Sequence, residues 1–187
     1  MVDALRTIGI SIDDSDDLRW RIEGRSFARK ASQIDVGNAG TVLRFVPPVA
    51  ALTRSAVRFD GDEAVRRRPI APLIGALRAL GVDIDDGDRG APPFTVIGTG
   101  AVAGGRVAVD ASASSQLISA LLLAGPSYGA GVEVRHIGAA PVPNAPHLAM
   151  TVTMLAARGA QVEVGDDLWR VPPGKLAGIE QTIEPDL

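Results

Sequence analysis

The sequence predicts an α+β protein built from a repeated unit of strands and helices. A helical segment that ends at a glycine and continues into an apolar strand begins at Leu5, again at Leu77 and, more weakly, at Leu155. Downstream of each copy comes a short strand that starts with an aromatic residue: Trp20–Glu23, Phe94–Ile97 and Trp169–Val171. Each copy therefore predicts a helix, a glycine stop, a strand, a turn and a second strand.

The second and third copies also have a strand and a helix before this point, so the complete unit is predicted to be βαβαββ. We expect the copies at about residues 1–24, 25–98 and 99–174, with 175–187 leading out toward a further domain. The first copy opens inside its second helix, which leaves about two and a half of three units. We therefore expect a single, partial domain over 1–187, and a natural chain that starts upstream of Met1.

Within the second copy, apolar residues at three- and four-residue spacing from Ile70 to Leu80 predict a helix from about Pro69 to Leu80 that buries one stripe. A second helix is expected over Thr41–Leu52. Pro47-Pro48 should kink or break it, since a proline inside a helix costs about 3 kcal/mol. The acidic runs Asp13–Asp17 and Asp85–Asp88 are predicted to be solvated turns.

The composition excludes several classes of protein. With 46% hydrophobic and 22% charged residues and a net charge of -3, the chain is a soluble globular protein for which nucleic acid is not an expected partner. It has no cysteine, and His136 and His147 lack metal-ligand spacing, so we expect no metal and no cofactor. His136 lies on the predicted strand Val132–Ile137 and is interpreted as structural. No apolar run is long enough for a membrane span and no signal peptide opens the chain, so a cytoplasmic location is expected.

Three hydroxyls and an amide occur in Asp110–Gln116, directly before the apolar stretch Leu117–Leu123. Small polar residues at a helix start leave the first backbone N–H groups unpaired, and Ser114, Ser115 and Gln116 add side-chain donors. Together with the positive end of the helix dipole, these donors favour a bound phosphate. The alternative interpretation is a serine N-cap on a buried helix.

Small residues open another predicted helix in the segment Gly37–Arg44. Gly37 and Gly40 permit backbone conformations, and a close approach by a ligand, that a Cβ would hinder. The alternative is a glycine-rich turn with Thr41 as the helix cap. Two such helix starts in one chain favour a shared anionic ligand.

Three arginines, Arg66, Arg67 and Arg68, precede Pro69, a residue favoured in the first helical turn. A guanidinium pairs with a phosphate through two parallel hydrogen bonds. We expect Arg66 and Arg67 to lie on a solvated face. Arg68 directly precedes the helix, where the other anion-binding features gather, and is predicted to contact the anion.

These segments resemble the family of 3-phosphoshikimate 1-carboxyvinyltransferase, also called 5-enolpyruvylshikimate-3-phosphate synthase. The resemblance is carried, in the family's order, by Gly37–Arg44, Asp60–Asp62 with Arg68–Ile70, Asp110–Gln116 and Glu184–Leu187. It implies an enolpyruvyl-transferase-type α/β prism, in which two similar domains each contain three repeated units and this chain is most of one substrate-binding domain. It also implies transfer of the enolpyruvyl group of phosphoenolpyruvate to the 5-hydroxyl of shikimate 3-phosphate, a step toward chorismate and the aromatic amino acids.

The resemblance assigns a first group of residues to shikimate 3-phosphate. Ser114 and Ser115 match the family's ligands of its phosphate, and Gln116 matches an amide placed between the two substrates. Asn144 stands where the family commonly has a serine, and His147 where it often has a tyrosine. An asparagine amide still donates to a phosphate and an imidazole still stacks, so both are kept as substrate-binding residues. The alternative for His147 is packing at a helix N-terminus.

A second group is assigned to phosphoenolpyruvate: Asn38, Gly40, Arg68 and Gln116. Thr41 and Arg44 complete the same motif and are expected to support it, Thr41 as the helix cap and Arg44 by bracing the loop. The family's catalytic carboxylates belong to the other domain, so no catalytic residue is expected in this chain, which should be inactive by itself. The other domain of the same chain is the expected partner, and the full enzyme is expected to be monomeric.

Three alternatives stay open at this point. UDP-N-acetylglucosamine carboxyvinyltransferase shares the prism-like fold, but the segment Ser114–Gln116 favours the shikimate enzyme. RNA 3′-phosphate cyclase is built from related units, yet a chain with net negative charge and 4% aromatic residues lacks the basic, stacking surface expected for RNA. The third alternative is a phosphate-binding module without chemistry.

Overall fold

The computed structural model describes residues 1–24, 27, 30–68 and 70–183. Helices and strands are interspersed along this chain, as expected of an α+β protein. The helices are α1 (Val2–Thr7), α2 (Gly40–Ala50), α3 (Glu63–Arg66), α4 (Ala71–Ala79), α5 (Gln116–Ala124) and α6 (Ala145–Ala157), with a 3-10 turn, η1, at Gly125–Ser127. The strands are β1 (Ser11–Asp16), β2 (Arg19–Glu23), β3 (Ser32–Asp35), β4 (Ala56–Asp60), β5 (Asp83–Asp85), β6 (Phe94–Ile97), β7 (Gly105–Val109), β8 (Val132–His136), β9 (Glu163–Gly165) and β10 (Leu168–Val171).

Two four-stranded sheets have the same strand order and the same strand directions. The order is β3-β4-β6-β5 in the first sheet and β7-β8-β10-β9 in the second. In both sheets the first two strands are parallel and the other neighbours are antiparallel. Helices α2 and α5 connect the parallel strands of their sheets, so the predicted βαβαββ unit occurs twice. Helix α1 and the hairpin β1-β2 repeat the latter half of the unit.

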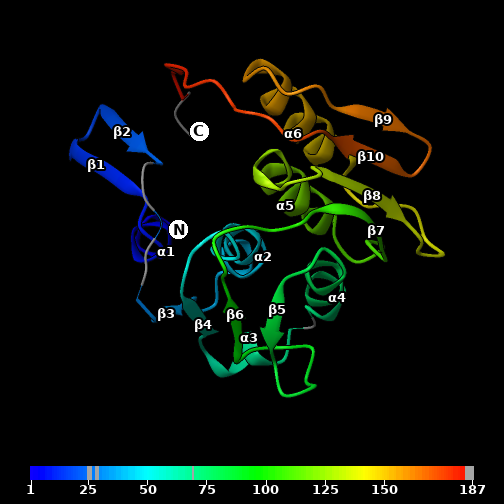
Figure 1. The fold of residues 1–187 in the computed structure, drawn as a ribbon, viewed down its shortest axis with the longest axis horizontal. Helices are drawn as coiled ribbons and strands as arrows, with labels where there is room; N and C mark the ends of the chain where they lie inside the picture. Colours follow the sequence, from blue (N-terminus) through cyan, green and yellow to red (C-terminus); the bar gives the residue numbers. More distant parts are fainter. Residues whose placement is uncertain (25–26, 28–29, 69, 184–187) are drawn as a thin grey trace.

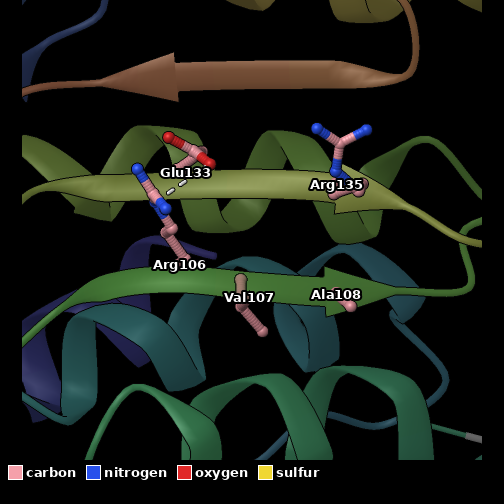
Figure 2. Close-up of a pocket in the computed structure, with 5 residues that line it drawn as sticks. All are labelled: Arg106, Val107, Ala108, Glu133 and Arg135. Atoms are coloured by element: carbon pink, nitrogen blue, oxygen red, sulfur yellow. Dashed lines mark ion pairs between the residues drawn. The ribbon is translucent and has the colours of Figure 1, made fainter.

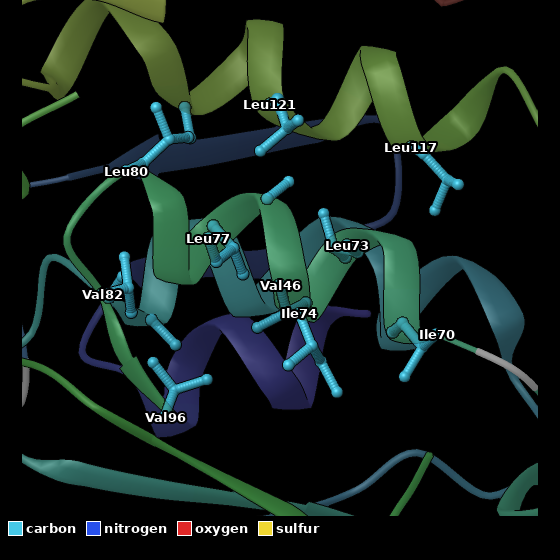
Figure 3. Close-up of a cluster of buried hydrophobic side chains, with 14 of the residues drawn as sticks. Val46, Ile70, Leu73, Ile74, Leu77, Leu80, Val82, Val96, Leu117 and Leu121 are labelled. Carbon is cyan, nitrogen blue, oxygen red and sulfur yellow. The ribbon is translucent and has the colours of Figure 1, made fainter. Parts of the chain in front are cut away.

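Figure 1 shows α2, α4 and α5 near the middle of the molecule, with the two four-stranded sheets and the β1-β2 hairpin around them. The stripe predicted on α4 is buried from Ile70 to Leu80, and its Leu73 and Leu80 lie on the side toward Leu117 and Leu121 of α5 (Figure 3). Across the two units, α2 packs against α5 and α4 packs against β7, so the units share one core. Within the described part of the chain, no helix is both long and apolar enough to cross a membrane.

Helix α2 continues through Pro47 and Pro48, so the break expected there is not found. Proline at these positions removes two N–H donors, and the helix continues for two residues beyond Pro48. The carbonyl of Pro48 accepts a hydrogen bond of 2.8 Å from the buried hydroxyl of Tyr128. Burial also raises the pKa of Tyr128 above its usual range, which keeps this donor protonated.

Most residues of the two acidic runs are exposed, as predicted, but the structure differs from the prediction at two points. Most of Asp13–Asp17 belongs to strand β1. Asp86 is buried, with 2% of its surface exposed, and accepts hydrogen bonds from Arg78 (2.7 Å) and from the backbone N–H of Gly90 (2.9 Å). The same guanidinium donates to the carbonyl of Ile84, so Arg78 ties the end of α4 to strand β5. The charge pattern alone did not reveal this buried partner.

Candidate functional site

Two helices begin at the carboxyl ends of parallel strands. Helix α2 follows β3 and helix α5 follows β7, and each first strand is paired in parallel with the strand that comes after the helix. Both helix starts therefore direct unpaired N–H groups and a positive dipole end toward the edge where the parallel strands stop. The fold thus provides two helix N-termini of the kind that binds anions.

The turn before α2 is held by the segment that follows β4. Gly37 has a φ of +51°, and its carbonyl accepts a hydrogen bond from the N–H of Asp62 at 3.0 Å. Gly61 packs so closely on this turn that an added methyl group would lie 2.9 Å from Val36 and within contact distance of the Gly37 carbonyl. Gly37 therefore meets the predicted need for an unusual backbone conformation. Gly40 has no positive φ, so this part of its predicted role is wrong.

The turn before α5 is held in the same way by the segment after β8. The Nδ1 of His136 accepts a hydrogen bond from the N–H of Ala111 at 3.2 Å, and its Nε2 lies 2.9 Å from the carbonyl of Ala140. Because Nδ1 accepts, Nε2 carries the proton and donates to that carbonyl. Gly138 packs against Ser112 so tightly that there is no room for a side chain. His136 is therefore structural, as predicted, and it braces the loop that carries the serines.

Two guanidinium groups meet over the first residue of α2. A methyl group added at Gly40 would lie 2.7 Å from Nη1 of Arg68 and 3.2 Å from Nη1 of Arg44. Arg44 reaches this point because a helical side chain four residues along lies on the same face and tilts toward the N-terminus. The Nη1 of Arg44 also donates a hydrogen bond of 2.8 Å to Oε1 of Gln116, the first residue of α5. This bond brings the two helix starts together.

The charges at this place are not neutralised. Arg66 pairs with Asp60 at 2.9 Å and Arg67 pairs with Glu63, whereas Arg44 and Arg68 have no acidic partner among the residues described. Burial lowers the pKa of Arg44, and the neighbouring positive charge of Arg68 lowers it further. Two unpaired guanidiniums beside two helix N-termini form a strongly positive site. Such a site is stabilised by an anion.

The predicted serines lie at the start of α5. Ser115 is buried and is the N-cap residue, although its side chain makes no capping hydrogen bond. The hydroxyl of Ser114 accepts a hydrogen bond of 3.3 Å from the N–H of Gln116. Ser114 thus caps a backbone N–H at the helix start, which was the alternative to phosphate binding. It lies two residues before Gln116, which contacts Arg44.

Other predicted residues are exposed and are not joined to this cluster by any side-chain hydrogen bond in the described ranges. Asn38 lies in the turn before α2. Asn144 is the N-cap residue of α6, with a left-handed φ of 54°, and its side chain makes no capping bond. His147 lies in the first turn of α6, where its N–H donates to the carbonyl of Asn144 at 3.0 Å. The structure leaves the ligand roles of these three residues as predictions.

Two details of the predicted site are corrected by the structure. Thr41 is not the cap, because α2 begins at Gly40 with Ala39 as its N-cap residue and no side-chain cap. Arg68 does not directly precede α4. It follows the short helix α3, which was not predicted, and α4 begins at Ala71 with Pro72 in its first turn. Pro69 lies outside the described residues.

Sequence reasoning assigned Arg44 a supporting role in its own loop and missed its bond to Gln116. The spacing of four residues from Gly40 was the available signal. A separate hollow on the outer face of the second sheet is lined by Arg106, Val107, Ala108, Glu133 and Arg135 (Figure 2). Arg106 pairs there with Glu133 at 3.3 Å, and none of the predicted site residues contributes to this hollow.

The fold and the site define the chain as a repeated α+β protein with a positively charged site between two helix starts. The chain belongs to the EPSP synthase (3-phosphoshikimate 1-carboxyvinyltransferase) family, whose model matches residues 1–187. It is 50% identical over 190 residues to the 3-phosphoshikimate 1-carboxyvinyltransferase of Mycobacterium ulcerans (strain Agy99), and it spans 100% of its own length and 42% of that relative.

Two solved structures of EPSP synthase from Acinetobacter baumannii have the same fold. Each superposes on this chain with a TM-score of 0.75 at 26% sequence identity, over 95% of this chain. The match spans 39% of one of these chains and 40% of the other. The predicted enolpyruvyl-transferase fold is therefore confirmed.

Proposed function

We propose that this chain binds the phosphate groups of phosphoenolpyruvate and shikimate 3-phosphate, as part of an enzyme that transfers the enolpyruvyl group from the first to the second. The observation that carries the proposal is the meeting of Arg44 and Arg68 over Gly40, with Arg44 bonded to Gln116 at the start of α5. Two helix starts held together in this way suit two phosphorylated substrates. The family membership supports the same pair of substrates.

The start of α2 suits phosphoenolpyruvate. Arg68 and the N–H groups near Gly40 would hold its phosphate, with Asn38 at the rim. In enolpyruvyl transfer the hydroxyl gives up its proton and adds to the enol carbon while the methylene carbon gains a proton. The resulting tetrahedral intermediate then loses a proton from that methyl carbon and expels inorganic phosphate, which restores the double bond. Negative charge on that phosphate grows as the C–O bond breaks. Preorganised guanidinium and helix N-terminal charges stabilise such a developing anion more than they stabilise the bound substrate.

The start of α5 suits shikimate 3-phosphate. Ser114, Ser115 and the first N–H groups of the helix would donate to its phosphate. Gln116 would lie between the two substrates, because it is the residue that contacts the α2 side of the site. Asn144 and His147, at the start of α6, would contact the same substrate from the neighbouring helix of the same unit.

The remaining parts of the proposal concern the whole protein. The second domain would supply the acid and base groups for proton transfer, since the chain spans 42% of the relative it matches. We propose a monomeric enzyme, without a cofactor, that acts in the cytoplasm. Polyanions of this kind do not cross a lipid bilayer unaided, so the enzyme would act in the same compartment as the reactions that supply its substrates. The isolated chain should release no phosphate from the two substrates above background.

Adjacent arginines offer a matched test of phosphate binding. Arg68→Met removes an unpaired guanidinium from the site, whereas Arg67→Met removes the same charge from an exposed side chain that pairs with Glu63. Loss of a hydrogen bond to a charged group costs about 1.5–3 kcal/mol, so Arg68→Met should weaken phosphoenolpyruvate binding roughly 10- to 150-fold. Calorimetric titration of the 187-residue chain measures both variants. Equal affinities for the two variants would contradict the proposal.

A second titration tests the serines. The double variant Ser114→Ala, Ser115→Ala should weaken shikimate 3-phosphate more than phosphoenolpyruvate, by about tenfold or more. Ser127→Ala, at an exposed position in η1, is the control. If the melting temperature of the double variant falls while its affinity for shikimate 3-phosphate is unchanged, the serines serve only the helix start.

A further inference from the structure

A side-chain hydrogen bond joins the starts of α2 and α5. It runs from Nη1 of Arg44 to Oε1 of Gln116 at 2.8 Å, between residues that belong to different repeated units. Both side chains are half-buried. The inference drawn from this bond rests on the proposed function, because it concerns the same site.

The chemistry of the bond decides how the Gln116 amide is turned. A guanidinium has only donors, so the amide atom that faces Arg44 must be the carbonyl oxygen. The amide nitrogen then points away from Arg44, on the other side of the planar group. With its oxygen occupied, Gln116 offers two N–H donors to a ligand. The Gln116 amide therefore suits a ligand that presents an anionic oxygen, not one that presents another hydrogen-bond donor.

Helix α2 places Arg44 where its guanidinium can contact the Gln116 oxygen. Arg44 lies one turn after Gly40, and its side chain tilts back over the helix start toward α5. Arg68 already supplies a guanidinium over Gly40 that has no acidic partner in the described part of the chain, so the site has a cation for the phosphate without Arg44. The guanidinium of Arg44 lies beside that of Arg68 and is repelled by its charge. The hydrogen bond to the Gln116 oxygen compensates part of this repulsion.

We propose that Arg44 is a positioning residue, which fixes the Gln116 amide so that its N–H groups face the substrate and thereby links the two phosphate sites. Arg44 acts on ligand affinity through Gln116 and not by binding the phosphate itself. This role differs from bracing its own loop, because its partner lies on the helix of the other unit.

A double-mutant cycle separates the two roles. Arg44→Met and Gln116→Met should each weaken shikimate 3-phosphate by roughly tenfold or more, as expected for a lost donor to a charged group. If Arg44 acts through Gln116, the double variant loses no more than Gln116→Met alone. If the losses in the double variant multiply, Arg44 binds the phosphate directly and the proposal is overturned. Arg106→Met, an exposed arginine on the second sheet, controls for the change in net charge.

A third substitution tests the direction of the amide. Gln116→Glu keeps an oxygen for Arg44 and replaces the outward NH2 group with a second oxygen. It should therefore weaken shikimate 3-phosphate more than Gln116→Met does, because an anion then faces an anion. A smaller loss than in Gln116→Met would contradict the proposed orientation.

A measurement without ligand distinguishes failure of this proposal from failure of the proposed function. The order parameter of the Gln116 side-chain nitrogen, from NMR relaxation, should be near the rigid value of about 0.85 in the unsubstituted chain and fall below about 0.6 in Arg44→Met. Arg106→Met should leave it unchanged. A low order parameter in the unsubstituted chain refutes the positioning role even if both substrates bind. If the order parameter falls in Arg44→Met but the unsubstituted chain binds neither substrate, the proposed function is refuted and the positioning role is not.

Discussion

Replacement of Gly40 by alanine tests whether this position is kept free for a ligand or for the backbone. Gly40 is the first residue of α2 and has no positive φ, so alanine fits the backbone there. Alanine is favoured over glycine within helices by up to about 1 kcal/mol. The stability of the fold should therefore stay the same or rise slightly, and a loss of function would have to come from the site.

The size of the effect follows from the distance to Arg68. The added methyl group would lie 2.7 Å from Nη1 of Arg68, so the guanidinium must retreat by about 0.7 Å to reach ordinary contact distance. A hydrogen bond of about 2.9 Å would then lengthen to about 3.6 Å, beyond the useful range. Loss of one hydrogen bond between Arg68 and phosphate costs about 1.5–3 kcal/mol, or roughly 10- to 150-fold in affinity.

The assay is calorimetric titration of phosphoenolpyruvate and of shikimate 3-phosphate, together with thermal melting. Gly40→Ala should weaken phosphoenolpyruvate more than shikimate 3-phosphate at an unchanged melting temperature. Gly75→Ala is the control, because Gly75 is exposed on α4, has no neighbour within 4 Å and should gain stability without a change in binding. A lower melting temperature with unchanged affinity for phosphoenolpyruvate would refute the reasoning.

Three further substitutions test the scaffold around the site. Asp86→Asn should lower the free energy of unfolding near neutral pH by about 1–3 kcal/mol, in the lower part of this range because Arg78 is partly exposed. The hydrogen bond from Arg78 lowers the pKa of Asp86 in the folded protein, so its stabilising effect is present above the unfolded pKa of about 3.9 and is lost as pH falls through the folded value. The free energy of unfolding, measured with urea from pH 7 to pH 2, should fall less steeply with decreasing pH in the variant. An unchanged slope would contradict this origin. Gly61→Ala should destabilise the fold by about 1–3 kcal/mol, because its methyl group meets the carbonyl of Gly37, and an unchanged urea midpoint would show that the turn yields easily. Gly138→Ala should displace the loop before α5 and weaken shikimate 3-phosphate more than phosphoenolpyruvate, which titration would contradict if both affinities fell equally.

The sequence by itself determined the fold class, the repeat and the positions of most elements. The apolar stripe on α4 and the aromatic-led strands β2, β6 and β10 were predicted within one or two residues, because periodicity and glycine stops act over short distances along the chain. The start of α5 after the serines was also predicted. These features depend on neighbours in sequence, which a single chain displays directly.

Local sequence signals were insufficient where contacts with other segments offset a residue's own preference. Pro47 and Pro48 predicted a kink or a break, but α2 continues through both. Its end is buried, and the carbonyl of Pro48 accepts a hydrogen bond from the hydroxyl of Tyr128, which belongs to a distant segment. Asp86 lies in an acidic run that predicts solvent, yet it is buried against a guanidinium and two backbone donors. In both cases the deciding partner was not recognisable from the segment's own composition.

Only the tertiary structure decided how the anion-binding residues meet. Arg44 and Gln116 lie 72 residues apart and bond because α2 and α5 begin side by side in adjacent units. Arg68 comes over Gly40 because the segment after β4 is packed against the turn before α2 through Gly61. Residue types and short spacings indicate which side chains suit a phosphate. The packing of one unit against the next determines which of them share it, because that packing depends on the whole core and not on any single segment.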